Sequence, residues 1–228
     1  MSWPVLTFIV LLPLVLVPYF GHRGAKVDWQ QKGINWVDGL VRLLCKHVHG
    51  LDVSQQIPLP ATGPAIVVAN HVSGVDPFLL ISACRRPLRF LIVREEYERP
   101  GLHWLFKASG CIPVDRTGRP EKALRQALRA LERGEVVALF PHGKIHLDSE
   151  PPLKIKGGVA RLATWSQAEI YPVRITGVKG EGKVALAPFI PSQVQLIMHK
   201  PRSFEATEMK ACLAEITKAI SAEAKIKT

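Results

Sequence analysis

The sequence predicts an α/β fold, with a mostly parallel central sheet flanked by helices. Short runs rich in Val, Ile and Leu, at 65–69, 136–140 and 170–175, are typical of strands buried on both faces. Segments with helical periodicity separate these runs, and strands that alternate with helices indicate a parallel sheet. Because 228 residues suffice for one sizeable core, we expect one main domain behind a membrane-associated helical segment at the N-terminus.

The first segment is strongly apolar. From Pro4 to Phe20 there are 17 residues without a charge, which as a helix cover about 25 Å, against roughly 30 Å of bilayer hydrocarbon. Pro13 would kink this helix, so it barely spans a membrane or dips into one leaflet. No positive region precedes it and no cleavage pattern follows, which favours a retained anchor over residues 1–26. Arg23 and the basic residues beyond it place the main domain on the cytoplasmic face, at the inner membrane if the cell is bacterial.

The next segment, residues 27–60, is expected to contain an amphipathic helix and a linker. Apolar residues recur at spacings of three and four over residues 28–48, and Trp29 and Trp36 suit the headgroup zone. A helix lying on the membrane and a helix packed on the core both fit this pattern. A stretch rich in Pro and Gly then leads into the main domain, residues 61–228.

Strands and helices alternate along the main domain. We expect strands at 65–69, 88–93, 136–140, 170–175, 183–190 and 194–199. We expect helices at 77–84, 102–108, 119–133, 157–166 and 205–224.

A polar turn follows the first strand. Asn70-His71 ends the strand, and Asp76-Pro77 begins a helix, with Asp76 as the expected N-cap. His71 therefore lies at the carboxyl end of a strand, where ligands bind in α/β sheets. Asp76 could bind one imidazole nitrogen and leave the other free to take a proton from a hydroxyl. Alternatively, Asp76 only caps the helix and His71 is an ordinary turn residue.

Residues 70–76 resemble the first motif of the glycerolipid acyltransferases, the lysophosphatidate (1-acylglycerol-3-phosphate) O-acyltransferase family. Three further blocks follow in the family's order: 110–116 (GCIPVDR), 140–143 (FPHG), and 156–157 (KG) with 170–173 (IYPV). The resemblance spans about residues 60 to 190, and four motifs in order are a specific pattern.

This resemblance implies an acyltransferase domain over 61–228 that moves a fatty acyl group from acyl-CoA or acyl-carrier protein to a lysophospholipid hydroxyl. The simplest reaction converts 1-acylglycerol-3-phosphate to phosphatidate. His71 would be the general base, oriented by Asp76, and Arg116 would bind the acceptor phosphate. The other substrate-binding residues would be His142, Gly143, Lys144, Lys156 and Gly157. No cofactor is expected.

The third motif departs from the family. It commonly reads FPEGTRS, whereas residues 140–146 read FPHGKIH, with His142 in place of the glutamate. The acceptor could therefore be a different lysolipid, or the chain could be an inactive lipid-binding protein. His142 and His146 are four residues apart, but without a helix or nearby carboxylates to complete the ligands, we expect no metal site.

The overall charge narrows the partners. A formal net charge of +11 favours anionic partners such as membrane phospholipids. No nucleic-acid recognition motif accompanies the charge, so nucleic acid is not expected to bind. Four scattered cysteines without a C-x-x-C pair predict free, mostly buried thiols.

Overall fold

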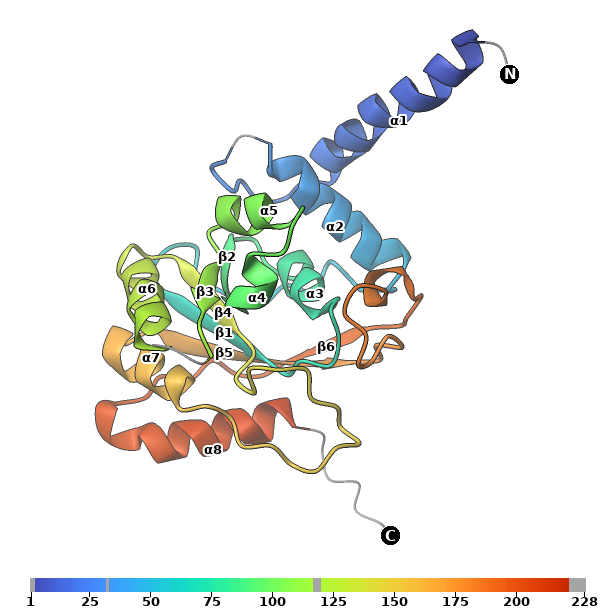
Figure 1. The fold of residues 1–228 in the computed structure, drawn as a ribbon. Helices are drawn as coiled ribbons and strands as arrows, with labels where there is room; N and C mark the ends of the chain where they lie inside the picture. The colour runs from blue at the N-terminus through green and yellow to red at the C-terminus, as the bar shows by residue number, and fades with distance from the viewer. Residues whose placement is uncertain (1–2, 32, 117–119, 222–228) are drawn as a thin grey trace.

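The computed structural model describes residues 3–31, 33–116 and 120–221 (Figure 1). Its centre is a six-stranded sheet with the strand order β3-β2-β4-β1-β5-β6. The strands are β1 (Ala65–Ala69), β2 (Leu88–Val93), β3 (Ile112–Val114), β4 (Val136–Leu139), β5 (Glu169–Thr176) and β6 (Gln195–Met198). Neighbouring strands run parallel except β5 and β6, which are antiparallel. The prediction of a mostly parallel α/β sheet is confirmed.

Helices cover both faces of the sheet. One face packs against α6 (Pro120–Glu132), α7 (Gly158–Ser166) and α8 (Met209–Ile220). The other face packs against α2 (Asn35–His47), α3 (Asp76–Ser82), α4 (Arg94–Tyr97) and α5 (His103–Ala108). The central strand β1 is buried throughout, with Val67 in one core cluster and Ile66 and Val68 in the other. Alternate side chains of a strand point to opposite faces, so β1 contributes to both halves of the core.

Some predicted elements are wrong. The run 183–190 forms no strand but a loop with a single 3-10 turn, η1 (Ala187–Phe189), and its apolar side chains Leu186 and Phe189 are exposed. Only part of the run is buried, since Ala187 has no exposed surface whereas Leu186 and Phe189 face outward. The helix predicted from residue 28 begins only at Asn35, because Gln30 and Gly33 have positive φ angles that no helix can contain.

The end of the chain and two short elements also differ from the prediction. The helix predicted over 205–224 consists of η2 (Ala206–Glu208) followed by α8, and residues 222–224 lie outside the described residues, as does residue 119. The short elements β3 and α4 were not predicted, because three or four residues carry too little periodicity.

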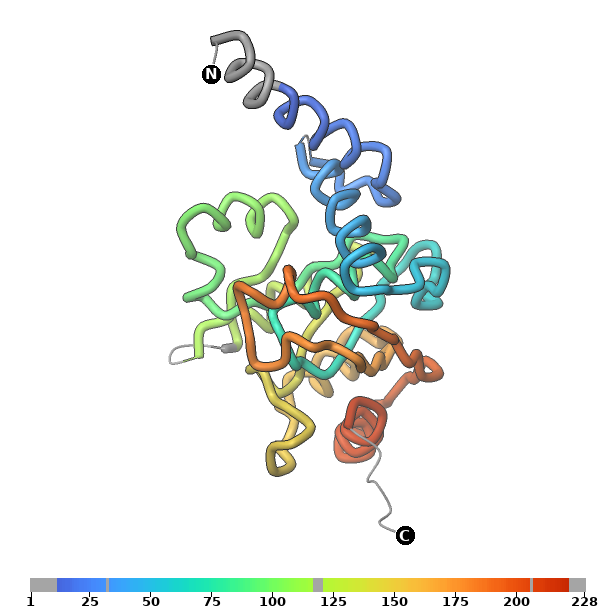
Figure 2. Tube along the Cα trace, turned by 90° about the vertical axis from the view of Figure 1, so that its right-hand side faces the viewer, coloured from blue at the N-terminus to red at the C-terminus, as the bar shows by residue number. Residues whose placement is uncertain are grey.

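The N-terminal helix α1 (Trp3–Gly24) extends away from the sheet and packs near its end on α2 (Figure 2). Glycines allow this approach, since a Cβ on Gly39 would lie 1.7 Å from the carbonyl oxygen of Gly21. In the part of the chain that the structure describes, no helix combines the length and apolarity needed to cross a membrane.

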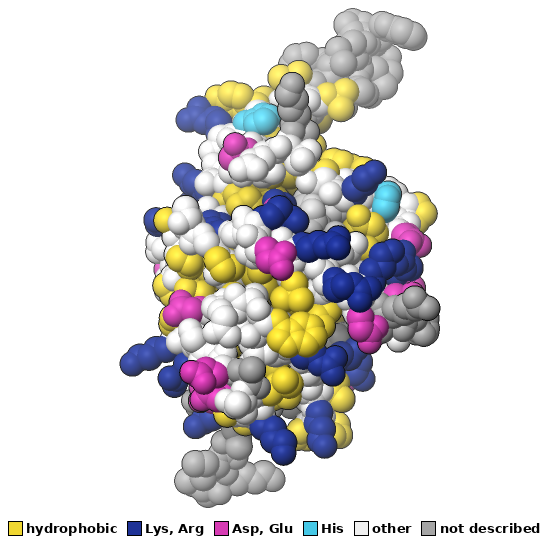
Figure 3. Space-filling model, turned by 90° about the vertical axis from the view of Figure 1, so that its left-hand side faces the viewer, with side chains coloured by type: hydrophobic (Ala, Val, Ile, Leu, Met, Phe, Trp, Pro, Cys, Tyr) yellow, Lys and Arg dark blue, Asp and Glu magenta, His cyan; other side chains and the backbone are white. Residues whose placement is uncertain are grey.

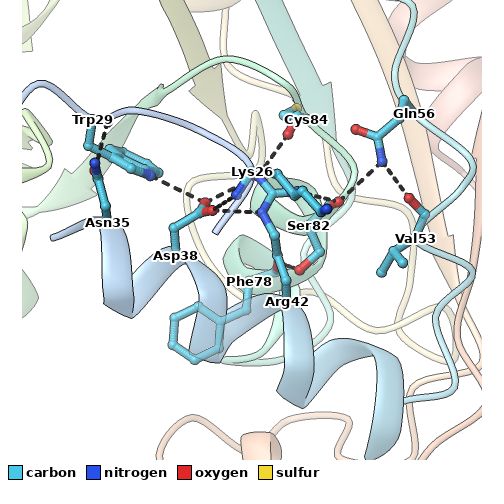
Figure 4. A network of polar contacts seen from close by, with 10 residues as sticks. All are labelled: Lys26, Trp29, Asn35, Asp38, Arg42, Val53, Gln56, Phe78, Ser82 and Cys84. Atoms are coloured by element: carbon cyan, nitrogen blue, oxygen red, sulfur yellow. Dashed lines mark hydrogen bonds and ion pairs between the residues drawn. The ribbon is translucent and has the colours of Figure 1, made fainter. Parts of the chain in front are cut away.

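A buried ion pair fastens α2 to α3 (Figure 4). Asp38 and Arg42 pair at 2.8 Å, and Asp38 also accepts hydrogen bonds from the Lys26 amide and the Trp29 indole. Arg42 donates to the carbonyl oxygens of Ser82 and Cys84, at 2.9 and 2.8 Å, where α3 ends. Both charged side chains of this network therefore have partners, which a buried charge requires. The segment after α1 is thus anchored on the main domain.

Candidate active site

The first and third motifs meet at one edge of the sheet. Strands β1 and β4 are parallel neighbours, so the residues that follow their carboxyl ends, His71 and His142, lie at the same edge. Asn70 fixes the start of the turn, because its side chain both donates to and accepts from the backbone of Ile175 on β5, at 2.9 and 2.7 Å. This crevice at the carboxyl ends of parallel strands is where α/β proteins bind ligands.

His71 and Asp76 form a direct pair. Nδ1 of His71 lies 2.8 Å from Oδ2 of Asp76, whose carboxylate is completely buried. The same carboxylate accepts hydrogen bonds from the amides of Val72 and Ser73, at 2.6 and 2.9 Å, and from the Ser73 hydroxyl at 3.0 Å. A carboxylate needs donors, so Nδ1 carries a proton, and in the neutral imidazole the lone pair is therefore on Nε2.

The predicted N-cap is wrong. Asp76 is the first residue of α3, the N-cap position falls on Val75, and no side chain caps the helix. The Asp76 carboxylate instead binds the turn that precedes the helix and the His71 ring. The alternative in which Asp76 only caps the helix therefore does not describe this turn.

Phe140 holds the other side of the imidazole. Its ring stacks on His71 with centroids 4.2 Å apart and an angle of 15° between the planes. The amide of His146 donates to the carbonyl oxygen of His71 at 2.8 Å, which ties the third-motif loop to the first. This role of Phe140 was not predicted from the sequence, although an aromatic residue immediately before Pro141-His142 was the available signal.

A cavity of about 1130 Å³ opens beside His71. Most of its wall is apolar, and it extends from His71 between β2 and the helices α2, α3 and α5 toward Trp29. Representative wall residues are Val37, Phe78, Phe90, Leu105 and Phe106. An apolar cavity with a few polar groups at one end is the usual form of a small-molecule site. The contribution of α2 and α5 to this wall could not be inferred from motifs, because neither helix contains one.

The polar groups of the cavity are mainly basic. Arg116, Gly143, Lys144 and Lys156 all lie on its wall, and the Arg116 guanidinium donates to the carbonyl oxygen of Gly143. Gly143 has φ +72°, and a Cβ there would lie 2.6 Å from Nζ of Lys156. Two cationic groups thus converge on one glycine, an arrangement that is chemically suited to an anion with several oxygen acceptors.

His142 differs from these residues, because it is not part of the cavity wall. It is 8 % exposed, and its Nδ1 has no hydrogen-bond partner among the described residues. Burial, followed by the positive charge of a protonated His146, lowers the pKa of His142 below its ordinary value. His146 itself pairs with Glu150 at 2.8 Å. Within the described residues no three His, Cys, Asp or Glu side chains gather as metal ligands.

Gly157 is also not part of the cavity wall, although its neighbour Gly158 is. A Cβ on Gly157 would meet no atom within 4 Å, and its φ of −64° is open to any residue. The backbone thus does not require a glycine here. The substrate-binding roles of His142 and Gly157 stay predictions.

The chain is similar in sequence to several proteins of known name. The chain is 23% identical over 176 residues to the 1-acyl-sn-glycerol-3-phosphate acyltransferase of Bacillus subtilis, covering 75% of this chain and 85% of that protein. It is 25% identical over 183 residues to the N-acylphosphatidylethanolamine synthase of Arabidopsis thaliana, covering 71% and 64%. It is 33% identical over 130 residues to a probable 1-acyl-sn-glycerol-3-phosphate acyltransferase of Mycoplasma genitalium, covering 52% and 46%. The chain thus spans about half to two-thirds of the length of two of these relatives.

The fold is shared with a solved structure. The 1-acyl-sn-glycerophosphate (LPA) acyltransferase of Thermotoga maritima superimposes with a TM-score of 0.60 over 96% of this chain and 95% of that one, at 21% identity. The family model named Acyltransferase matches residues 47–176, which is more than half of the chain and includes all of the motifs. The chain belongs to the Acyltransferase family.

Proposed function

We propose that this protein transfers a fatty acyl group from a thioester donor, acyl-CoA or acyl-carrier protein, to the hydroxyl of a lysophospholipid. The simplest acceptor is 1-acylglycerol-3-phosphate, which gives phosphatidate. One observation carries the proposal: the His71–Asp76 pair stands where an apolar cavity meets a cluster of cationic side chains. The family and its named relatives support the same reaction class.

The chemistry follows from the free Nε2 of His71. The acceptor hydroxyl donates its proton to Nε2 as its oxygen attacks the thioester carbonyl, and the imidazolium returns the proton to the sulfur when the carbon–sulfur bond breaks. Asp76 stabilises the imidazolium through Nδ1. Ser73 is no nucleophile in this scheme, because its hydroxyl is bonded to Asp76. General-base catalysis contributes about 10²–10⁴-fold, and positioning of the two substrates supplies the rest.

The acceptor phosphate would bind at the basic end of the cavity. Arg116 offers a planar, permanently charged fork, while Lys156 and Lys144 add point charges. The acyl chain of the acceptor would lie in the apolar part of the cavity, beyond Phe78 and Phe90. This division puts the reacting hydroxyl, which lies between phosphate and chain, beside His71.

The N-terminal helix would hold the protein on its lipid substrate. Residues of α1 such as Leu14, Val15 and Phe20 expose 65%, 67% and 52% of their surface. Apolar surface of this extent gains free energy when it enters the acyl region of a bilayer. We infer that α1 inserts in one leaflet of the membrane with the catalytic domain on the cytoplasmic face.

The second candidate is transfer to a different acceptor. Its basis is His142, an imidazole where the family motif commonly has glutamate, together with the likeness to a relative named N-acylphosphatidylethanolamine synthase. In that relative's name the acylated lipid carries an ethanolamine headgroup. A lysolipid with a headgroup other than a bare phosphate is the corresponding acceptor here.

An acceptor panel tests the proposal. Membranes that contain the expressed protein are supplied with labelled acyl-CoA or acyl-carrier protein and with lysophosphatidate or lysophosphatidylethanolamine, and membranes without the protein are the control. We expect labelled phosphatidate from lysophosphatidate. Product from lysophosphatidylethanolamine alone would favour the second candidate. No product above the control from either donor and either acceptor would contradict acyl transfer and leave an inactive lipid-binding protein.

A further inference from the structure

A second cavity, of about 630 Å³, lies at the opposite edge of the sheet from His71. Its wall includes Arg89 near the start of β2, Ile112 at the start of β3, and Glu135 immediately before β4. Strands β1, β4 and β2 run parallel, and His71 follows the carboxyl end of β1. The cavity lies at the amino ends of the strands and therefore away from the proposed phosphate site near Arg116, although Trp29 and Cys111 belong to the walls of both cavities.

The wall of this second cavity is strongly basic. It contains four cationic side chains, Arg89, Lys107, Arg129 and Arg133, and one carboxylate, Glu135. Arg89 and Arg133 both pair with Glu135, at 3.3 and 3.1 Å. In the described part of the chain, neither Lys107 nor Arg129 has an ion-pair partner. Four cationic side chains and one carboxylate give the wall a net charge of +3. Figure 3 shows Lys and Arg side chains gathered on this face.

The surroundings of this cavity indicate what kind of anion would bind. Trp29, Gln30 and Gln31 on its wall belong to the segment that directly follows the apolar helix α1. Trp104 on α5 is 53% exposed, and Leu102, immediately before α5, is 39% exposed. Trp104 lies one helical turn from Lys107. Exposed Trp and Leu beside Lys and Arg are typical of a surface that lies at the membrane interface. Anionic lipid headgroups attract such basic residues.

We propose that this cavity binds the phosphate of an anionic phospholipid headgroup in the membrane surface, with Lys107 and Arg129 as the principal contacts. Trp104 and Leu102 then enter the lipid beside it. The headgroup site is a second attachment point, in addition to α1, and it fixes the rotation of the domain on the bilayer. Anionic lipid is required for this contact, whereas the apolar contact of α1 is not selective for charge.

The experiment compares two variants that lose the same net charge. Lys107→Gln/Arg129→Gln changes the cavity, and Lys210→Gln/Lys218→Gln changes exposed lysines on α8, which contributes no residue to the cavity wall. All four side chains are exposed, so both variants retain the core. Binding of the full chain is measured by flotation with vesicles of phosphatidylcholine alone and of equimolar phosphatidylcholine and phosphatidylglycerol.

We expect the cavity variant to lose affinity for the anionic vesicles by about 25-fold, at about 5-fold for each cation, and to bind neutral vesicles as the wild type does. The α8 variant should lose much less. Equal losses in the two variants, or an unchanged cavity variant, would overturn the proposal. Calorimetry with adenosine 3′,5′-bisphosphate tests whether the cavity binds a soluble phosphate instead. The headgroup proposal would also be overturned if the cavity variant lost binding of this compound but bound vesicles as the wild type does. Neither readout depends on acyl transfer, so failure of the proposed function is a separate result.

Discussion

Two histidines follow two neighbouring parallel strands, yet their surroundings differ. His71 has a carboxylate on Nδ1, an aromatic ring on its face and the cavity beside it. His142 is buried outside the cavity wall, with Nδ1 unpartnered in the described structure and a pKa lowered by burial. The difference indicates that position at a strand end alone does not equip a histidine to act as a base. A base needs a buried acceptor that orients one nitrogen and an open path to the other.

Replacement of His71 should have the largest effect. His71→Ala removes the proposed base, so we expect kcat to fall by about 10²–10⁴-fold while membrane association stays unchanged. Steady-state acyl transfer on membranes measures kcat, and flotation measures association. If turnover persists at the wild-type level, His71 is not the base.

Replacement of Asp76 should have the next largest effect. Asp76→Asn preserves the size of the side chain but removes the charge that stabilises the imidazolium, and we expect kcat to fall by about 10²-fold. The amides of Val72 and Ser73 lose a charged acceptor, so the free energy of unfolding should also fall, by about 1–3 kcal/mol. Urea denaturation measures the second effect. A variant that loses stability but keeps its kcat would reduce Asp76 to a purely structural role.

Replacement of Arg116 should mainly weaken binding of the acceptor. Arg116→Ala should raise KM for lysophosphatidate by about 10- to 100-fold, because a charged hydrogen bond to phosphate contributes about 1.5–3 kcal/mol. Arg116→Lys, which keeps the charge but loses the planar guanidinium, is the matched control. Its KM should lie between those of the wild type and Arg116→Ala. An unchanged KM in Arg116→Ala would remove this residue from the phosphate site.

His142 should give the smallest effect on turnover. We expect His142→Gln to change kcat by only a few-fold, because the ring lies outside the cavity wall. Its pKa is lower in the folded chain than in the unfolded chain, so protonation favours unfolding as the pH falls below the ordinary value of about 6.5. The variant should therefore lose less stability than the wild type between pH 7 and pH 5. Urea midpoints at both values measure this, and equal losses would show that His142 is not held neutral.

Sequence patterns were reliable where one local rule decides the outcome. The runs that became β1 and β4 are too apolar to be anything but buried, and the spacing from His71 to Asp76 allows the pair that the structure contains. The patterns failed where distant segments decide. The stacking of Phe140 on His71 depends on two strands becoming neighbours. The run 183–190 has strand composition, but β6 occupies the edge beside β5. The position of His142 outside the cavity depends on the path of a loop that no periodicity describes.

The most direct test of the account is a double variant that shows whether His71 and Asp76 act as one unit. Effects of residues that act together are not additive, whereas effects of independent residues multiply in rate. We predict that His71→Ala/Asp76→Asn has the kcat/KM of His71→Ala alone within about 2-fold, while His142→Gln lowers kcat/KM by the same small factor with or without His71. If the losses from His71→Ala and Asp76→Asn multiply instead, Asp76 does not work through His71, which contradicts the proposed catalytic pair.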